Sequence, residues 1–110
     1  NIIAGTKYIA KLNAIWEPEV EDKEERIKFI LASYNAGPGH VIDAKNLAVK
    51  YGKNPKLWSD VGYFLLNKSK RKYYNDDVVK HGYYKGFIAY DYVNEIMDRY
   101  HHYKNITEAP

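Results

Sequence analysis

A tyrosine and an asparagine stand together just before a cluster of helix-breaking residues, in the stretch SYNAGPGH at residues 33–40. The side-chain amide of Asn35 can donate and accept hydrogen bonds at once, which matches the N–H and C=O of an N-acetyl group. Tyr34 offers a ring face for a sugar and a hydroxyl for polar contact. Gly37 lets the backbone approach a ligand closely. The pair is a candidate binding site for an acetylated amino sugar, and the alternative is that Asn35 simply ends a helix before a turn.

The composition fits one globular domain with a polar partner. The chain has 110 residues, of which 45% are hydrophobic and 28% charged, a balance that excludes a disordered chain. Its net charge of +3 suits an anionic partner, such as nucleic acid or a cell-wall polymer, but requires neither. Without cysteine it forms no disulfide and no thiolate metal site. Its 12 tyrosines favour carbohydrate or peptide recognition, or else fill a helical core and its rim.

Helical periodicity runs through the chain and no stretch alternates like a strand, so the sequence predicts an all-α fold. Pro18 ends the first helix, and Gly37 with Pro38 ends the second. Asp22 is expected to cap the second helix and Asp60 the fourth. The expected helices cover residues 2–16, 23–35, 38–51, 61–67 and 87–103.

Apolar residues recur at helical spacing along single faces of the helices. The tryptophans Trp16 and Trp58 are expected to pack in the core. One face of the second helix carries Ile27, Ile30, Leu31 and Tyr34, and one side of the last helix carries Ala89, Tyr92, Val93, Ile96 and Tyr100.

The remaining charged residues carry no clear catalytic pattern. The run from Lys68 to Lys72, followed by two tyrosines, reads as a solvated loop. Such a run can also bind nucleic acid through phosphate contacts and stacking, but the low net charge and the lack of a recognised motif argue against this. The acids between residues 17 and 25 lie in a charged stretch, while Glu95 and Asp98 are expected to face solvent. None of these carboxyl groups is a convincing general acid.

Ordered motifs make the chain resemble the goose-lysozyme-like lytic transglycosylases over residues 1 to about 103. This family carries an A-x-Y-N-x-G-x-G-H segment, a helix, and then a G-x-x-P-x-x-W-x-D-V turn. NIIAGTKYIAKL resembles the helix that follows the family's Gly-Leu-Met-Gln motif, and GYYKGFIAYDYVNEI is similar to its G-Y-x-R-G-x-E-x-x-x-Y-V segment. The residues matching the first two motifs are Ala32, Tyr34, Asn35, Gly37, Gly39, His40, Gly52, Pro55, Trp58, Asp60 and Val61.

The resemblance implies a lysozyme-like helical domain that cleaves the β-1,4 bond between N-acetylmuramic acid and N-acetylglucosamine in peptidoglycan. In this family one glutamic acid protonates the leaving oxygen and then acts as a base, and the product is a 1,6-anhydro sugar. The family's Glu-Ser and Gly-Leu-Met-Gln motifs do not occur in the 110 residues. Residues 1–110 are therefore expected to be the C-terminal part of a catalytic domain, without the helix that carries the catalytic glutamate, and inactive alone.

The resemblance also implies roles for individual residues. Tyr34, Asn35 and Gly37 would form a substrate-binding wall opposite the glutamate. Tyr92 corresponds to the tyrosine of the family's Tyr-Val motif, whose hydroxyl lies near the catalytic carboxylate, although a tyrosine at this position can also be a core residue. Lys85 replaces the family's arginine, so the charge is kept but the bidentate fork is lost.

No metal or organic cofactor is implied, and the expected partner is a peptidoglycan glycan strand and not nucleic acid. The expected location is the bacterial cell envelope, periplasmic or associated with the outer membrane. Attachment to a membrane through a preceding region and the oligomeric state stay open. A different interpretation is a non-catalytic module that binds peptidoglycan.

Overall fold

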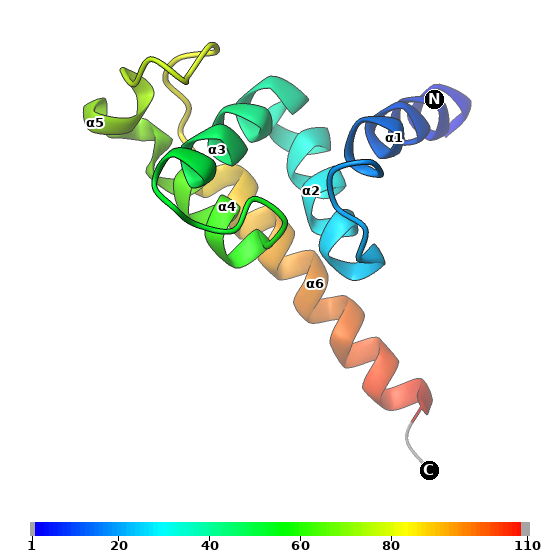
Figure 1. Cartoon of the computed structure of the whole chain (residues 1–110). Coiled ribbons are helices and arrows are strands. Elements are labelled where there is room, and N and C mark those ends of the chain that lie inside the picture. Colours follow the sequence, from blue (N-terminus) through cyan, green and yellow to red (C-terminus); the bar gives the residue numbers. More distant parts are fainter. Residues whose placement is uncertain (1, 109–110) are drawn as a thin grey trace.

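The computed structural model describes residues 2–108, with side chains from residue 4 to residue 107. These residues form six α-helices and one short 3₁₀ helix and contain no strand (Figure 1), which confirms the all-α prediction. The helices are α1 (Ile2–Trp16), α2 (Lys23–Ala36), α3 (Pro38–Lys50), α4 (Trp58–Leu66), the 3₁₀ helix (Asn67–Ser69), α5 (Arg71–Tyr74) and α6 (Phe87–Glu108).

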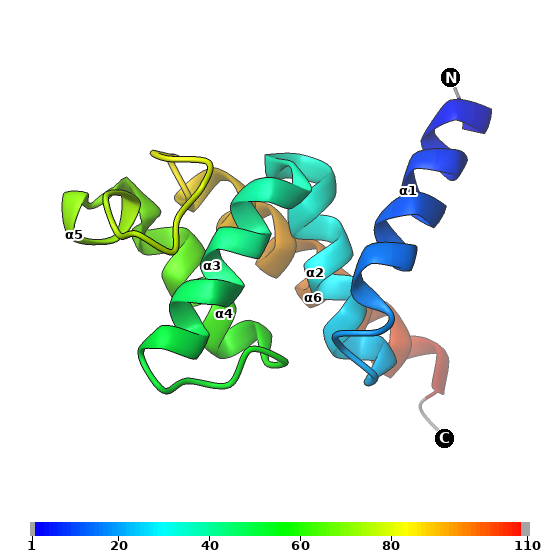
Figure 2. The ribbon, with the colours of Figure 1, turned by 45° about the horizontal axis from the view of Figure 1, so that its top comes forward.

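Helix α2 is the centre of the domain. It packs against α1, α3 and α6, while α4 packs against both α3 and α6. Helices α1 and α5 lie at opposite ends of the molecule, with α2 and α3 between them (Figures 1 and 2). The C-terminal part of α6 runs away from the other helices (Figure 1). The domain therefore has one packed middle and two helices, α1 and α6, that extend beyond it.

Helix α2 carries apolar residues on two sides, which are buried to different degrees. Phe29, Ala32 and Ser33 are buried, whereas Ile27 and Tyr34 are 43% and 48% exposed. The ring of Phe29 lies 5.0 Å from that of Trp16 and 6.2 Å from that of Trp58, measured between centroids. Helix α2 thus buries a face that the apolar stripe does not include, while Ile30 and Leu31 of the stripe are only partly buried against the core.

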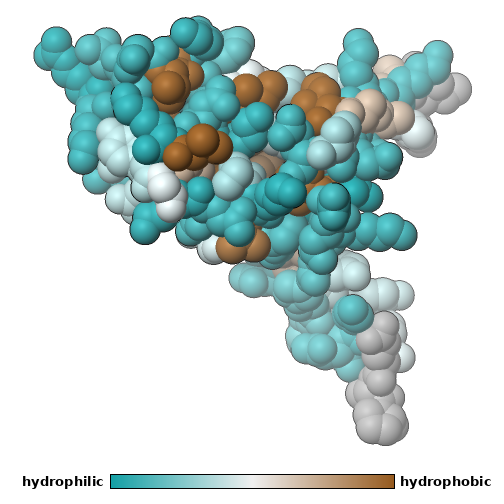
Figure 3. Space-filling view, in the orientation of Figure 1, coloured by the Kyte–Doolittle hydropathy of each residue, from teal (hydrophilic) through white to brown (hydrophobic). Residues whose placement is uncertain are grey.

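The apolar side of α6 is buried only along part of the helix. Ala89 and Val93 are buried, Met97 continues the buried stripe, and Tyr100 is exposed. Beyond Met97 the helix leaves the packed middle, so its apolar residues have few neighbours. On the face shown in Figure 3, brown hydrophobic atoms form several separate patches, and the projecting part of α6 is teal to pale.

None of the described helices combines the length and the hydrophobicity that a membrane crossing requires.

The two tryptophans join helices, which confirms their predicted packing role. Trp16 is fully buried and its indole N–H donates to Ser33 Oγ at 2.8 Å, linking α1 to α2. Trp58 is buried between α4 and the rest of the core, and its indole N–H donates to Asn94 Oδ1 of α6 at 3.2 Å. Each ring supplies apolar area together with a satisfied polar tip, so both fix the angle between two helices.

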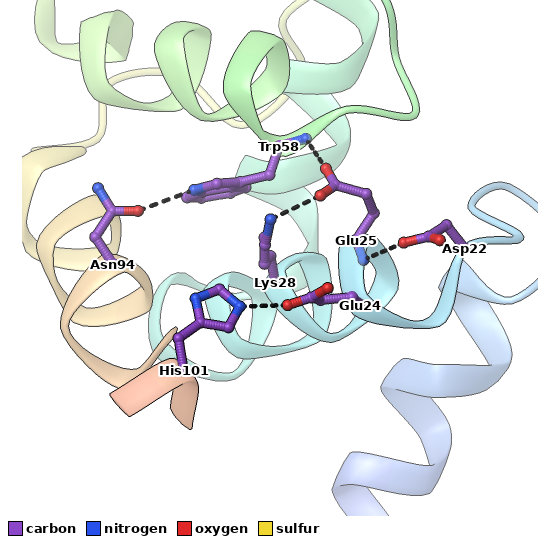
Figure 4. A network of polar contacts seen from close by, with 7 residues as sticks. All are labelled: Asp22, Glu24, Glu25, Lys28, Trp58, Asn94 and His101. Carbon is purple, nitrogen blue, oxygen red and sulfur yellow. Dashed lines mark hydrogen bonds and ion pairs between the residues drawn. The ribbon is translucent and has the colours of Figure 1, made fainter. Parts of the chain in front are cut away.

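Helix α4 begins at Trp58 and not at residue 61, and Asp60 does not cap it. Asp60 instead accepts a hydrogen bond from the backbone N–H of Asn54 at 2.9 Å. The backbone N–H of Trp58, at the start of α4, donates to the Glu25 carboxylate of α2 at 2.7 Å. Lys28 donates to the same carboxylate at 2.7 Å (Figure 4). A carboxylate at a helix N-terminus satisfies an orphan donor and favours the helix dipole. The cap of α4 therefore comes from another helix.

The predicted cap of α2 is confirmed. The Asp22 side chain accepts a hydrogen bond from the backbone N–H of Glu25 at 2.9 Å. On the same first turn of α2, Glu24 pairs with His101 of the projecting part of α6 (Figure 4). The start of α2 is thus tied both to its own cap and to the last helix.

The interpretation of the basic run as a solvated loop is wrong, because the run spans the 3₁₀ helix and the start of α5 and contains a buried lysine. Lys68 is 0% exposed and its ammonium donates to Asp43 Oδ2 of α3 at 2.6 Å. The Asp43 carboxylate also accepts the backbone N–H groups of Lys80 and His81, each at 2.8 Å. Burial alone would raise the pKa of Asp43, but these hydrogen bonds outweigh it and hold that pKa below its usual range.

His40 completes this buried cluster. Its Nδ1 lies 2.6 Å from the Lys68 ammonium, and its ring stacks on Tyr84 with centroids 4.6 Å apart. Because Lys68 has only donors, Nδ1 of His40 acts as the acceptor. Burial and the nearby charge of Lys68 lower the pKa of His40. Asp43, Lys68 and His40 therefore hold the start of α3 against the loop that contains Lys80 and His81.

Removal of the Asp43 charge should destabilise the folded chain. We expect Asp43→Asn to lower the free energy of unfolding by about 3–5 kcal/mol, because Lys68 would be left buried without its counter-charge. The matched control is Asp77→Asn, since the Asp77 side chain is 92% exposed and pairs with Lys50 at the surface. That variant should be nearly as stable as the parent in urea denaturation. Equal losses in both variants would show that the buried pair is not an anchor.

Mild acid should weaken the fold through His40. Because the pKa of His40 is lowered in the folded chain, the unfolded chain takes up this proton first, near the ordinary value of about 6.5. The free energy of unfolding should therefore fall as the pH drops below about 6.5, until the lowered folded pKa is passed. Urea denaturation at about pH 7 and about pH 5.5 measures the loss. His40→Gln should show a smaller loss over this range, and an unchanged loss would contradict the assignment.

Candidate functional site

An open apolar groove lies between α1, α2 and α6. Its volume is about 420 Å³ and it is lined by Ile9, Ile27, Ile30, Leu31, Tyr34 and Tyr92. A smaller hollow of about 140 Å³ adjoins it along α6 and shares Ile27 and Leu31. The larger space is within the range of small-molecule sites, which are concave and mostly apolar with a few polar groups.

The groove exists because α2 is apolar on two sides. Its inner side carries Phe29 and Ala32, both fully buried, and its outer side carries the residues that line the groove. Helix α1 contacts the domain chiefly through its last turns, where Leu12 and Trp16 are buried, so Ile9 stays open on the groove wall. Exposed large apolar side chains gathered in one concave place are typical of a binding surface.

The structure brings two of the predicted site residues together. Tyr34 of α2 and Tyr92 of α6 both line the groove, although 58 positions of sequence separate them. The ring of Tyr34 also lies 5.8 Å from that of Tyr8 on α1, at an interplanar angle of 47°. Tyr92 is partly buried against the core. The groove therefore combines an apolar base with two phenols on facing helices.

The other two predicted residues lie at the end of α2. Asn35 is exposed beside Tyr34, is not among the residues that line the groove, and makes no side-chain hydrogen bond within the described part of the chain. Gly37 has φ of +95°, a conformation that favours glycine, and its N–H donates to Ser33 O at 2.9 Å. Pro38 then begins α3. The predicted helix break is confirmed, and it leaves the Asn35 amide open to solvent.

No acidic side chain lines the groove or its adjoining hollow within the described residues. Glu95 and Asp98 of α6 are exposed as predicted, and Glu24 and Glu25 are engaged with His101 and with α4. Among the described residues no cluster of histidine and acidic side chains is placed to hold a metal ion. The described residues of the groove can therefore bind and orient a ligand, but they offer it no carboxyl proton.

Sequence reasoning did not assign Tyr8, Ile9, Ile27, Ile30 or Leu31 to the site. The available signal was that Phe29 and Ala32 lie on α2 outside the stripe of Ile27, Ile30, Leu31 and Tyr34, so that one helix carries apolar residues on two sides. One side can then enter the core while the other forms an exposed apolar surface, which is typical of a binding site.

Comparisons with known proteins show the family to which the chain belongs. A family model described as "Transglycosylase SLT domain" matches residues 1–57. The chain, a helical domain with an aromatic-edged groove, therefore belongs to the Transglycosylase SLT domain family. It is 42% identical over 96 residues to membrane-bound lytic murein transglycosylase F of Haemophilus influenzae strain PittEE, covering 87% of this chain and 19% of that protein.

Two further relatives of the same name come from other organisms. The protein from Desulfosudis oleivorans is 39% identical over 100 residues, covering 91% of this chain and 21% of its own length. The protein from Shewanella halifaxensis is 43% identical over 102 residues, covering 91% of this chain and 20% of its own length. The chain thus spans about a fifth of the length of the curated relatives that it matches.

Asn35 should be dispensable for folding. We expect Asn35→Ala to change the free energy of unfolding by less than about 0.5 kcal/mol, because the side chain is exposed and makes no hydrogen bond in the described chain. The control is Ser33→Ala two residues earlier, which removes the acceptor of the buried Trp16 N–H and should cost about 1–3 kcal/mol. Thermal or urea denaturation measures both. An Asn35→Ala chain that is unfolded at room temperature would make Asn35 a structural residue.

Proposed function

We propose that this chain is the glycan-binding wall of a peptidoglycan lytic transglycosylase. The support is threefold: the family model, the relatives named lytic murein transglycosylases, and an apolar groove bearing Tyr34 and Tyr92. The observation that carries the proposal is that one groove is lined both by Tyr34, which the family motifs imply for the substrate wall, and by Tyr92, which they imply near the catalytic carboxylate.

The reaction proposed for the parent protein is cleavage of the β-1,4 bond between N-acetylmuramic acid and N-acetylglucosamine. A glutamic acid protonates the leaving oxygen. Its carboxylate then takes the proton of the muramyl 6-hydroxyl, and the oxygen of this hydroxyl attacks the anomeric carbon. The C–O bond to the leaving sugar breaks and a 1,6-anhydro ring forms, so water is not consumed. One carboxyl group serves in turn as acid and base.

The apolar lining of the groove would help such a carboxyl group to keep its proton. Removal of a carboxylate from water raises its pKa, since burial disfavours the charged form. Ile27, Ile30 and Leu31 supply the apolar surface, and Tyr34 and Tyr92 supply hydroxyls that can hydrogen-bond a sugar or the acid. In this proposal the acid itself is outside the described residues, because none of their carboxyl groups lies in the groove.

The proposed role of Asn35 is recognition of an N-acetyl group. Its amide lies at the open end of α2, one residue from Tyr34, and makes no hydrogen bond that a ligand would have to break. A substrate in this position would be a glycan strand of the cell wall. The proposed location is therefore the cell envelope, periplasmic or associated with the outer membrane, in keeping with the relatives' names.

A second candidate function is a glycan-binding module without catalysis. The observation that favours it is the lack of any acid among the described residues of the groove. The two functions differ in what a complete parent protein does to murein sacculi.

Digestion of purified sacculi separates these possibilities. We expect the parent protein to release 1,6-anhydro-muropeptides, detected by mass spectrometry, and the 110-residue chain alone to release none. Asn35→Ala in the parent should lower the rate by about tenfold, since the bond to the acetyl group is lost in the transition state. The matched control, Asn105→Ala, removes another exposed helical asparagine, on α6, and should leave the rate unchanged.

Three other outcomes of these digestions would contradict a specific part of the proposal. Anhydro products from the chain alone would contradict the placement of the acid outside the described residues. A parent that binds sacculi but releases nothing would establish the non-catalytic module. Equal rates for Asn35→Ala and Asn105→Ala would contradict the proposed role of Asn35.

A further inference from the structure

A second pocket, distinct from the groove, lies at the other end of the domain. It has a volume of about 430 Å³ and is built from the end of α3, the loop that follows it, α4 and α5. Its lining residues are Tyr51, Lys53, Ser59, Asp60, Tyr63, Phe64 and Tyr73. It shares neither a residue nor a helix with the groove on α1, α2 and α6. Figures 1 and 2 both place α5 and α1 at opposite ends of the molecule.

Four aromatic rings form the body of this pocket. Phe64 and Tyr73 are buried at its base, and the ring of Phe64 lies 5.6 Å from those of Tyr51 and Tyr73 and 5.2 Å from that of Tyr63. The Lys72 ammonium lies 5.7 Å from the Tyr51 ring centre and 5.3 Å from that of Tyr73. These contacts hold the rings in place, while Tyr63 remains 49% exposed.

Polar groups of both kinds accompany the rings. Lys53 offers donors, Asp60 offers acceptors, and Ser59 can do both. Asp60 is fixed in position, because one of its oxygens accepts the backbone N–H of Asn54 at 2.9 Å. A purely apolar ligand would bury these polar groups without giving them hydrogen-bond partners, which costs free energy. The pocket therefore fits a ligand that has a flat apolar face and hydroxyls able to donate and accept.

We propose that this pocket binds a pyranose ring of a glycan, as a second sugar site away from the groove. The apolar face of the ring packs on Tyr63, and its hydroxyls hydrogen-bond to Lys53, Ser59 and Asp60. The choice of an acetylated amino sugar as the ligand rests on the proposed function of the groove, whereas the existence of the pocket does not. Two sites at opposite ends of the domain hold a long strand more firmly than one.

Titration of the ¹⁵N-labelled chain with chitotriose tests the proposal. Backbone amide shifts are expected at Tyr51, Lys53 and residues 59–64, besides any at the groove. Tyr63→Ala should weaken binding at the pocket by roughly three- to tenfold, the value of one aromatic contact. The matched control is Tyr83→Ala, because Tyr83 is 53% exposed and lies outside the pocket. Circular dichroism verifies that both variants are folded.

The outcomes at the two sites are read separately. Shifts at the pocket that persist in Tyr34→Ala establish a site independent of the groove, even if the groove itself does not bind. No shifts at the pocket with millimolar sugar would overturn the proposal, as would equal affinities for Tyr63→Ala and Tyr83→Ala. Shifts at the groove alone would leave the proposed function intact and refute the second site.

Discussion

The structure depends on a helix, α2, that must be apolar on two sides. One side packs Phe29 and Ala32 into the core beside Trp16 and Trp58, and the hydrophobic effect on this side holds α1, α4 and α6 around the centre. The other side cannot also enter that core, so it forms the open groove with α1 and α6. A wall of this kind offers a ligand apolar surface on a rigid element, which favours precise binding.

The C-terminal end of α2 is also held in place by specific contacts. Gly37 turns the chain with a positive φ, and α3 begins at once with Pro38. In the second turn of α3, Asp43 is held by Lys68 and by the backbone of the loop at Lys80 and His81. Because α3 cannot shift without breaking this buried pair, the turn that presents Tyr34 and Asn35 has a fixed support. A buried ion pair thus supports the turn next to a groove whose lining, among the described residues, is uncharged.

Local signals in the sequence predicted the helices well, because caps and breaks act within a few residues. The Asp22 cap and the Gly37–Pro38 break were confirmed in place. Contacts between distant residues could not be predicted: Lys68 pairs with Asp43 across 25 positions, and Glu25 caps α4 across 33. The periodicity of α2 showed an apolar face but not its burial, since only tertiary packing decides which apolar face is covered. Of the candidate site, the family motifs supplied Tyr34 and Tyr92, and only the fold showed that Ile9 joins them.

The most direct measurement on the groove is the position of a bound acetylated sugar. With chitotriose bound to the labelled chain, intermolecular nuclear Overhauser effects from the acetyl methyl protons should reach the ring protons of Tyr34 and the side-chain amide of Asn35, with Tyr92 close to the sugar ring. Overhauser effects confined to other residues at saturating sugar would contradict the central claim that α2 presents these groups to an N-acetyl sugar.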